Sequence, residues 1–230
     1  MSDRSPGGLD EFGLHILSPR LDSQEPLLKA SYDLWRNVWS QTFLELEGRG
    51  EVVSDDFTRQ DEIVVLTHAG APVGLVFHRF VDSRDRASLE DSYFRCWTPE
   101  AKESLCQAGP SLVIGSNITL HRDYRKSALQ ELPLKRLLTF ASLAFLGRRR
   151  DLDAITGTMR VDKGMHDLFY ECGAFALARG LLFHNVPVDL VGFFPRRRPI
   201  RVPTQDLRII HELENNGQKK GRKHEGQRTA

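Results

Sequence analysis

Apolar residues recur at helical spacing in two long segments of the chain. Large aliphatic and aromatic residues follow one another every three or four positions between Pro26 and Leu46, and Gly48 and Gly50 come directly after them. This spacing predicts a long amphipathic helix that ends at the glycines. Residues 132–146 are apolar at most positions, which predicts a second, largely buried helix.

Short runs rich in β-branched residues predict the strands. The segments EIVVLTH (62–68) and VGLVFHRFVD (73–82) are separated by AGAP, a combination that is typical of a β-hairpin. Further strands are predicted for residues 111–120, 154–161 and 175–194. Weak helical signals over 88–108 and a short helix over 165–172 complete the order. Helices and strands that alternate in this way predict a mixed α/β fold.

The two ends of the chain differ in character from its middle. Residues 1–24 are rich in Ser, Pro, Gly and Asp, and we expect a flexible N-terminal segment there. Residues 197–230 become polar and basic after Ile210, so a largely disordered tail is predicted. The folded domain is then expected to span residues 25–196.

Composition excludes several classes of protein. Hydrophobic residues make up 40% and charged residues 27% of the 230 residues, which is ordinary for a soluble domain. The three cysteines, Cys96, Cys106 and Cys172, are too few and too widely spaced for a disulfide framework or a metal motif. No signal peptide and no apolar segment long enough to cross a bilayer is visible. We therefore expect a cytoplasmic protein without a membrane span or a metal site.

Three ordered motifs carry a resemblance to a known superfamily. They are the hairpin 62–82, the segment ITLHRDYRKS (118–127) with the buried helix that follows it, and MHDLFYECGAF (165–175). In this order and spacing they resemble the GNAT acyltransferases. The resemblance implies a GNAT-like α/β fold, with a mixed central sheet flanked by helices. The aromatic first helix and the phrase SDDFTRQD (54–61) are similar to the branch of N-acyl amino acid synthases and acyl-homoserine-lactone (autoinducer) synthases.

The resemblance implies transfer of an acyl group, fatty in character, to the amine of an amino acid or similar small acceptor. The donor would be acyl-CoA or the acyl-phosphopantetheine of an acyl carrier protein, and no permanently bound cofactor is expected. The stretch RKSALQ (125–130) lacks the glycines with which the superfamily binds the CoA pyrophosphate. This difference favours an acyl carrier protein as partner.

Two residues are predicted to take part in proton transfer. Tyr170 matches the family tyrosine that protonates the departing thiolate, although a tyrosine packed in the core would fit the same pattern. His121 follows the central strand, where an imidazole could accept the amine proton, and a surface histidine without a role is the alternative.

The predicted donor site lies at the end of the same strand. Arginine and lysine side chains suit phosphate oxygens, and backbone amides there could pair with the pantetheine arm. The residues assigned to this site are Leu120, Arg122, Arg125, Lys126 and Ser127. A solvated basic loop is the alternative interpretation.

A pocket for the acceptor or the acyl chain is predicted from aromatic and polar residues of other segments. Its candidates are Trp35, Trp39, Asp56, Phe77, His78 and Asn117. The aromatic members also fit a core stripe, and Asp56 also fits a helix cap.

Two other functions stay open. The autoinducer synthases often carry Glu and Arg at the positions of Ile114 and Asn117, so the chain could be an inactive module that binds an acyl-pantetheine ligand or a protein partner. Basic runs at 148–150, 196–198 and 219–223 could bind nucleic acid. The net charge of +1 and the absence of a recognition motif argue against that partner.

Overall fold

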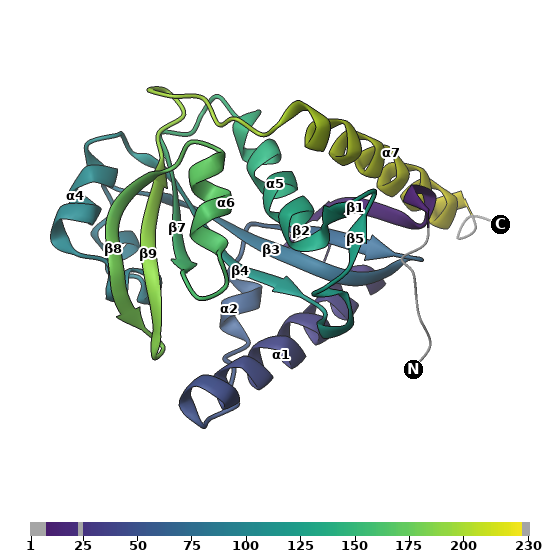
Figure 1. Ribbon diagram of the computed structural model, residues 1–230, viewed down its shortest axis with the longest axis horizontal. Helices are drawn as coiled ribbons and strands as arrows, with labels where there is room; N and C mark the ends of the chain where they lie inside the picture. Colours follow the sequence, from purple (N-terminus) through teal and green to yellow (C-terminus); the bar gives the residue numbers. More distant parts are fainter. Residues whose placement is uncertain (1–7, 23–24, 227–230) are drawn as a thin grey trace.

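A single mixed sheet forms the centre of the computed structural model, which describes residues 8–22 and 25–226 (Figure 1). The strands are β1 (Phe12–Leu17), β2 (Glu62–His68), β3 (Ala71–Asp82), β4 (Ser111–Leu120), β5 (Ala128–Leu129), β6 (Leu132–Pro133), β7 (Ala154–Arg160), β8 (Phe175–Phe183) and β9 (Val186–Phe193). The helices are α1 (Pro26–Glu47), α2 (Asp55–Thr58), α3 (Arg86–Leu89), α4 (Pro99–Cys106), α5 (Leu134–Gly147), α6 (Met165–Glu171) and α7 (Thr204–Gly226). Short 3-10 turns are η1 (Leu9–Glu11), η2 (Ser92–Cys96) and η3 (Arg122–Tyr124).

The seven-stranded sheet has the order β1-β2-β3-β4-β7-β9-β8. Neighbouring strands are antiparallel except β4 and β7, which run parallel at the centre. β5 and β6 form a separate small hairpin, in which Gln130 and Glu131 both have positive φ. Two central residues with positive φ are typical of a type I′ turn. This hairpin lies between the end of β4 and the start of α5.

Most predicted elements are confirmed. The predicted hairpin corresponds to β2 and β3, and the strand 111–120 corresponds to β4. α1 begins with Pro26 in its first turn, where the missing N–H costs no hydrogen bond. It ends at Gly48, which has a left-handed φ of 72° that suits glycine. Helix α5 begins two residues later than predicted, because Leu132 and Pro133 form β6.

Helices cover both faces of the sheet. On one face α5, α6 and α7 enclose the largest core, which includes Val64, Val76, Val113 and Val191 (Figure 1). On the other face α1 and α2 cover a second core around Trp35. η2 and α4 cover a third core on that same face. The second and third cores lie on either side of the centre of the sheet, so a space between them opens above β4 and β7.

The chain ends differ from the sequence prediction. Within the segment expected to be flexible, Phe12–Leu17 form β1, which pairs with β2 from His68 to Ile63. Within the predicted tail, Thr204–Gly226 form α7. Ile209, Ile210 and Leu213 of this helix are buried. Both elements depend on long-range contacts with each other, which local composition does not reveal. Residues 1–7, 23–24 and 227–230 lie outside the described residues, so those parts of the prediction are not compared.

The docking of α7 on β1 brings two backbones very close together. A Cβ atom on Gly217 would lie 2.1 Å from the carbonyl oxygen of Leu14, and a Cβ atom on Gly13 would lie 3.3 Å from Gly217. Asn216 also donates from Nδ2 to the carbonyl oxygen of Leu9 at 3.1 Å. Glycine at position 217 is therefore required for this close approach.

We expect Gly217→Val to lower the free energy of unfolding by about 1–3 kcal/mol, because the helix has to move away from β1. Asn215→Val is the matched control, since it places the same side chain on an exposed position of α7. Urea unfolding of both variants measures the difference. Equal losses in the two variants would contradict the close packing of α7 against β1.

Among residues 8–22 and 25–226, none of the helices combines the length and the apolar character needed to span a bilayer.

Candidate active site

The centre of the sheet opens where its two parallel strands separate. β4 pairs with β7 from Leu112–Ala154 to Gly115–Gly157. Beyond these pairs β4 continues to Leu120 and β7 continues to Arg160, with no register between the two in the described chain. The strands therefore form a V whose open end lies beside Ser116–Leu120.

A bulge in β4 lies at this opening. Leu75 of β3 pairs with Thr119 and Phe77 pairs with Ser116, so two residues of β4 stand opposite one residue of β3. Asn117, in the bulge, has a φ of 52°. The extra residue of a bulge is left out of the hydrogen-bond ladder, so its backbone groups are available to a ligand.

Two tryptophans of α1 hold the bulge in place. Trp35 donates from Nε1 to Oδ1 of Asn117 at 3.2 Å, and Trp39 donates from Nε1 to Oγ1 of Thr119 at 2.9 Å. Thr119 in turn donates to the carbonyl oxygen of Asn117 at 2.7 Å. The aromatic stripe of α1 thus contributes polar contacts to β4 as well as core packing.

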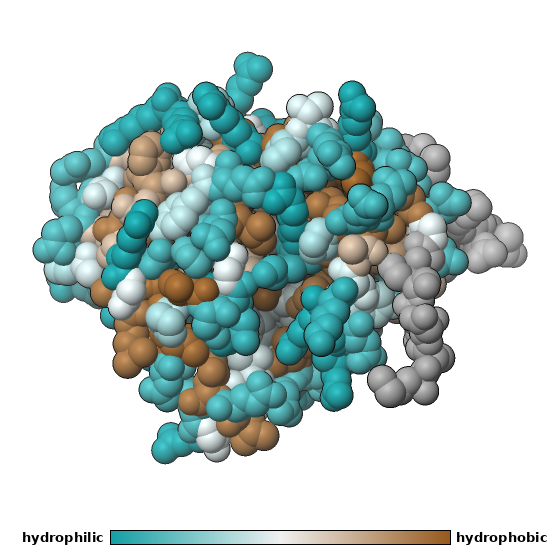
Figure 2. Space-filling model, in the orientation of Figure 1, coloured by the Kyte–Doolittle hydropathy of each residue, from teal (hydrophilic) through white to brown (hydrophobic). Residues whose placement is uncertain are grey.

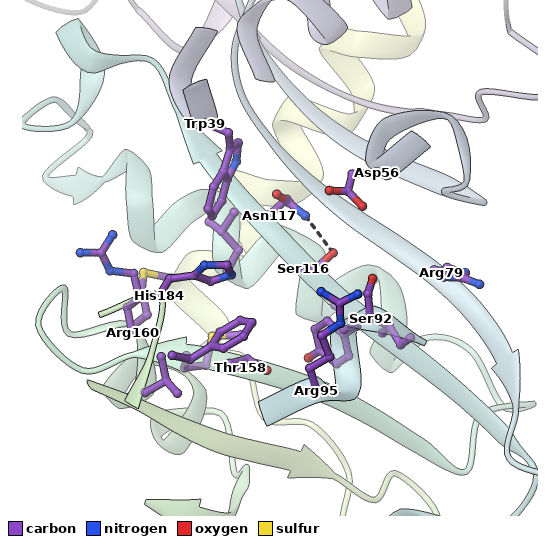
Figure 3. Close-up of a pocket in the computed structure, with 18 of the residues that line it drawn as sticks. Trp39, Asp56, Arg79, Ser92, Arg95, Ser116, Asn117, Thr158, Arg160 and His184 are labelled. Carbon is purple, nitrogen blue, oxygen red and sulfur yellow. Dashed lines mark hydrogen bonds between the residues drawn. The ribbon is translucent and has the colours of Figure 1, made fainter. Parts of the chain in front are cut away.

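A cavity of about 360 Å³ fills the opening (Figure 3). This volume lies within the usual range of small-molecule sites. One end is mainly aromatic and aliphatic, with Arg160 beside it, and the other end carries the charged side chains of Asp56 and Arg79. Its lining comprises Trp35, Trp39, Phe43, Leu46, Asp56, Arg59, Gln60, Arg79, Asp91, Ser92, Tyr93, Arg95, Ile114, Gly115, Ser116, Asn117, Ile118, Thr158, Met159, Arg160, Met165, Phe183, His184, Val186 and Val188.

The charged end is organised around Asp91, the N-cap residue of η2. Its carboxylate accepts a hydrogen bond from Arg79, and Arg59 lies 3.6 Å away. Arg59 also forms an ion pair with Asp56 at 2.6 Å. Burial by itself would raise the pKa of Asp91, but the N–H of Tyr93 and the guanidinium groups of Arg79 and Arg59 outweigh it and lower the pKa below 3.8. Asp91 therefore stays ionised and fixes both arginines at the cavity.

Two polar atoms at this end are buried without a hydrogen-bond partner among the described residues. They are Oε1 of Gln60 and Nε of Arg59. Gln60 is 3% exposed, and its Nε2 donates to the carbonyl oxygen of Asp56 at 2.6 Å. Buried polar groups are normally paired. Oε1 of Gln60 can accept a hydrogen bond and Nε of Arg59 can donate one, so this end of the cavity is suited to a polar ligand.

Four side chains, two from η2 and the residue after it and two from β7, form two hydrogen-bonded pairs beside the cavity. Thr156 donates from Oγ1 to the hydroxyl oxygen of Tyr93 at 3.2 Å, and Trp97 donates from Nε1 to Oγ1 of Thr158 at 3.0 Å. Burial raises the pKa of Tyr93 well above its usual value of 10, so this phenol stays protonated. Tyr93 is therefore a neutral phenol rather than a base at neutral pH.

Several solved structures have a similar fold. The CoA-dependent acyl-homoserine lactone synthase BjaI, with SAM and isopentyl-CoA, is 19% identical with a TM-score of 0.56, covering 87% of this chain and 88% of that chain. The acyl-homoserine lactone synthase LasI is 12% identical with a TM-score of 0.53, covering 79% of this chain and 88% of that chain. FeeM, an N-acyl amino acid synthase from uncultured soil microbes, is 12% identical with a TM-score of 0.51, covering 80% and 90%.

The chain has the GNAT fold. The resemblance inferred from the three sequence motifs is thereby confirmed at the level of the fold. No protein-family model and no curated protein sequence matches the chain. The V between β4 and β7 is thus the feature of this GNAT fold on which the candidate site is built.

Several predicted pocket residues come together at the V. Trp35, Trp39, Asp56 and Asn117 all line the cavity. Phe77 lies behind them, with its ring centroid 5.7 Å from that of Trp35. Sequence reasoning missed the charged partners Arg59, Arg79 and Asp91. The only local signal for them is an arginine within the apolar strand 73–82 and an arginine within SDDFTRQD.

His78 lies on the opposite face of the sheet, in the core beneath α5. It is fully buried, and its Nε2 lies 2.7 Å from Oγ of Ser142. Its Nδ1 lies 3.8 Å from Glu62, which is paired with Arg149 at 3.0 Å. The structure therefore places His78 away from the cavity.

His78 makes the stability of the protein depend on pH. Burial lowers the pKa of His78 below 6.5, against the opposing effect of Glu62. The unfolded chain then binds a proton that the folded chain does not, so we expect stability to fall as the pH drops below 6.5. His78→Gln should remove this dependence of stability on pH. Ser142→Ala should lower stability at every pH but leave its pH dependence unchanged. The midpoint of urea unfolding, measured over about three pH units from pH 8 to pH 5, tests both effects. A slope that persists in His78→Gln would contradict this assignment.

The two predicted proton-transfer residues do not meet. Tyr170 of α6 donates to the carboxylate of Asp189 at 2.7 Å, and Asp189 also accepts from the N–H of Gly180 at 2.9 Å. Burial and the Asp189 carboxylate raise the pKa of Tyr170 to about 12. His121 caps η3, with Nδ1 accepting from the N–H of Asp123 at 3.3 Å. Neither Tyr170 nor His121 lines the cavity, and their catalytic roles stay predictions.

The predicted donor residues lie together in the segment that connects β4 to α5. Arg125 approaches the carbonyl oxygen of Leu120 at 3.5 Å, and the carbonyl oxygen of Ser127 accepts from the N–H of Leu134 at the start of α5. The side chain of Arg122 is 85% exposed. Lys126 is exposed in the same loop. These cations lie beyond the open end of the V and outside the cavity lining.

Within the described ranges, no group of three or more His, Cys, Asp or Glu side chains is arranged to hold a metal ion.

Proposed function

We propose that this protein is an N-acyltransferase that moves an acyl group from a thioester to the amine of an amino acid or a similar small acceptor. The observation that carries the proposal is the two-ended cavity at the V, with the β4 bulge between its ends. The apolar end suits an acyl chain. The charged end suits a small zwitterion, since Asp56 and Gln60 offer oxygen atoms to an ammonium group and Arg59 offers N–H groups to a carboxylate.

In the proposed reaction the acceptor amine attacks the thioester carbonyl carbon. A C–N bond forms, the C–S bond breaks, the amine loses a proton and the thiolate takes one up. The backbone N–H of Asn117, which lies in the bulge, is the proposed donor to the carbonyl oxygen as it becomes negative. Tyr93 lines the cavity as a neutral phenol, so its hydroxyl is a candidate hydrogen-bond donor to the departing thiolate, which takes its proton from solvent.

Direct attack is favoured over a covalent enzyme intermediate. Cys172 directly follows α6, but it is fully buried, and burial raises the pKa of its thiol to about 12. A thiol with such a pKa is not a nucleophile at neutral pH. Cys96 and Cys106 are free and their pKa values are also raised by burial.

The acyl donor is proposed to be acyl-CoA or an acyl carrier protein, with the arm entering between β4 and β7 from the side of α5. Arg122, Arg125 and Lys126 then lie where a phosphate group or an acidic protein surface would arrive. The same residues serve either donor, so both belong in the test.

Purified protein mixed with acyl-CoA or acyl carrier protein and a set of amino acids tests the proposal. We expect an N-acyl product by mass spectrometry and one free thiol released per product. An inactive binding module, which the residues Ile114 and Asn117 favour, would bind the acyl thioester without releasing thiol or forming product. That outcome would reject the enzymatic function.

Tyr170→Phe separates a catalytic from a structural role of this tyrosine. Because the hydroxyl is paired with Asp189, we expect the variant to lose about 1–3 kcal/mol of stability and to keep most of its acyl-transfer rate. Urea unfolding and thiol release measure the two quantities. A large loss of rate with unchanged stability would instead support Tyr170 as the acid.

A further inference from the structure

The apolar end of the cavity is closed by two elements that belong to different halves of the sheet. Phe43 and Leu46 come from the last turns of α1, which packs on β3 and on the adjoining part of β4. Phe183, His184 and Val186 come from the β8–β9 hairpin, which continues the sheet beyond β7. The two sets line the same end of the cavity, where Figure 3 shows His184 with Arg160 beside it, across the cavity from Asp56 and Arg79.

Specific contacts join the two elements. Nδ1 of His184 hydrogen-bonds to the carboxylate of Glu47, and Nδ2 of Asn185 donates to the carbonyl oxygen of Leu46 at 3.0 Å. The ring of Phe43 lies 5.1 Å from that of His184. We call these contacts of Phe43, Leu46 and Glu47 with His184 and Asn185 the α1–hairpin bridge.

The hairpin presents His184 in a defined position. His184 and Asn185 have φ values of 50° and 60°, and they join strands that pair directly from Phe183–Val186 onward. A two-residue turn with both φ values positive is a tight, well-ordered connection. Hydrophobic side chains also gather on the outer surface over the hairpin and the adjacent end of α1, where Leu182 is 74% and Leu44 is 50% exposed (Figure 2). The bridge is therefore a thin wall between the cavity and the surface.

We propose that the α1–hairpin bridge is the end wall of the acyl chamber and sets the length of the acyl chain that the protein accepts. The inference rests on the proposed function, because it takes the thioester carbonyl to lie at the β4 bulge. From there an acyl chain runs along Met159, Met165 and Val188 towards the bridge. The polar contacts of His184 and Asn185 hold the wall closed against the chain.

An end wall has a measurable signature in a series of ligands. Each methylene buried along the apolar lining should tighten binding by about fourfold. The gain stops when the chain end reaches Phe43 and His184, because longer chains have to displace packed side chains. A plot of affinity against chain length should therefore rise and then break.

The experiment measures binding of straight-chain acyl thioesters of N-acetylcysteamine by calorimetry. Phe43→Ala and His184→Gly remove parts of the wall, and glycine keeps the left-handed φ that position 184 needs. Val186→Phe fills the chamber. Leu44→Ala is the matched control, since it makes a similar truncation on the neighbouring, outward-facing residue of α1.

We expect the break to move to chains about two carbons longer in Phe43→Ala and His184→Gly, and to shorter chains in Val186→Phe. Leu44→Ala should keep the wild-type break. The same break in all five proteins, or no rise in affinity with chain length in the wild type, would overturn the end wall. Binding needs no acyl transfer, so shifted breaks in a protein that forms no N-acyl product would sustain the end wall and reject the enzymatic function.

Discussion

Arg59→Lys is expected to raise the KM for the acceptor amine by about 10- to 100-fold, with a much smaller change in kcat at saturating acceptor. Arg59 lines the charged end of the cavity, pairs with Asp56, and has a buried Nε without a partner in the described chain. Lysine keeps the positive charge but removes the planar fork and its Nε. The loss therefore falls on recognition of the acceptor carboxylate.

Arg84→Lys is the control for this substitution. Arg84 is 76% exposed and forms an ion pair with Asp82, outside the cavity lining. Steady-state kinetics with varied acceptor and with varied donor separate the two binding sites. A raised KM for the thioester with an unchanged KM for the acceptor would place Arg59 in the donor site and refute this assignment.

The part of the fold that sequence reasoning recovered rests on local patterns. β2, β3 and β4 are short β-branched runs, and α1 and α5 carry clear helical spacing. Each of these elements can be predicted from its own residues alone. β1 does not, because its six residues become a strand by pairing with β2. α7 is polar along most of its length, so its few buried residues give a weak signal.

The residues of the candidate site also divide into those that local sequence patterns predict and those that they do not. Trp35, Trp39 and Asn117 were found because an aromatic stripe and a family motif mark them. Arg79 lies in β3 and Asp91 caps η2, and only the packing of these elements brings their side chains together. Tyr170 and His78 show the reverse case. Each fits a plausible role by residue type, yet Tyr170 is engaged by Asp189 and His78 is buried on the far face.

Asp91→Ala is expected to lower the free energy of unfolding by about 3–5 kcal/mol, because it leaves the partly buried charges of Arg59 and Arg79 without their shared partner. Asp85→Ala is a closely matched control. Both aspartates accept an N–H two residues on, from Tyr93 at 2.8 Å and from Ala87 at 3.0 Å respectively. Asp85 caps an exposed turn, so its loss should cost only about 1 kcal/mol.

The difference between these two variants isolates the ion pairs of the charged end from the cap. The pKa of Asp91 is lowered from 3.8 in the folded protein, so its contribution is complete above that pH and is lost as the pH falls through the lowered value. Urea unfolding at neutral pH measures the loss of stability in each variant. Urea unfolding near pH 3, about one unit below the ordinary pKa of an aspartate, tests whether the contribution of Asp91 falls at low pH. Equal losses in Asp91→Ala and Asp85→Ala would mean that Asp91 acts only as a cap. The arginines would then reach the cavity without it, and the charged end would not depend on η2.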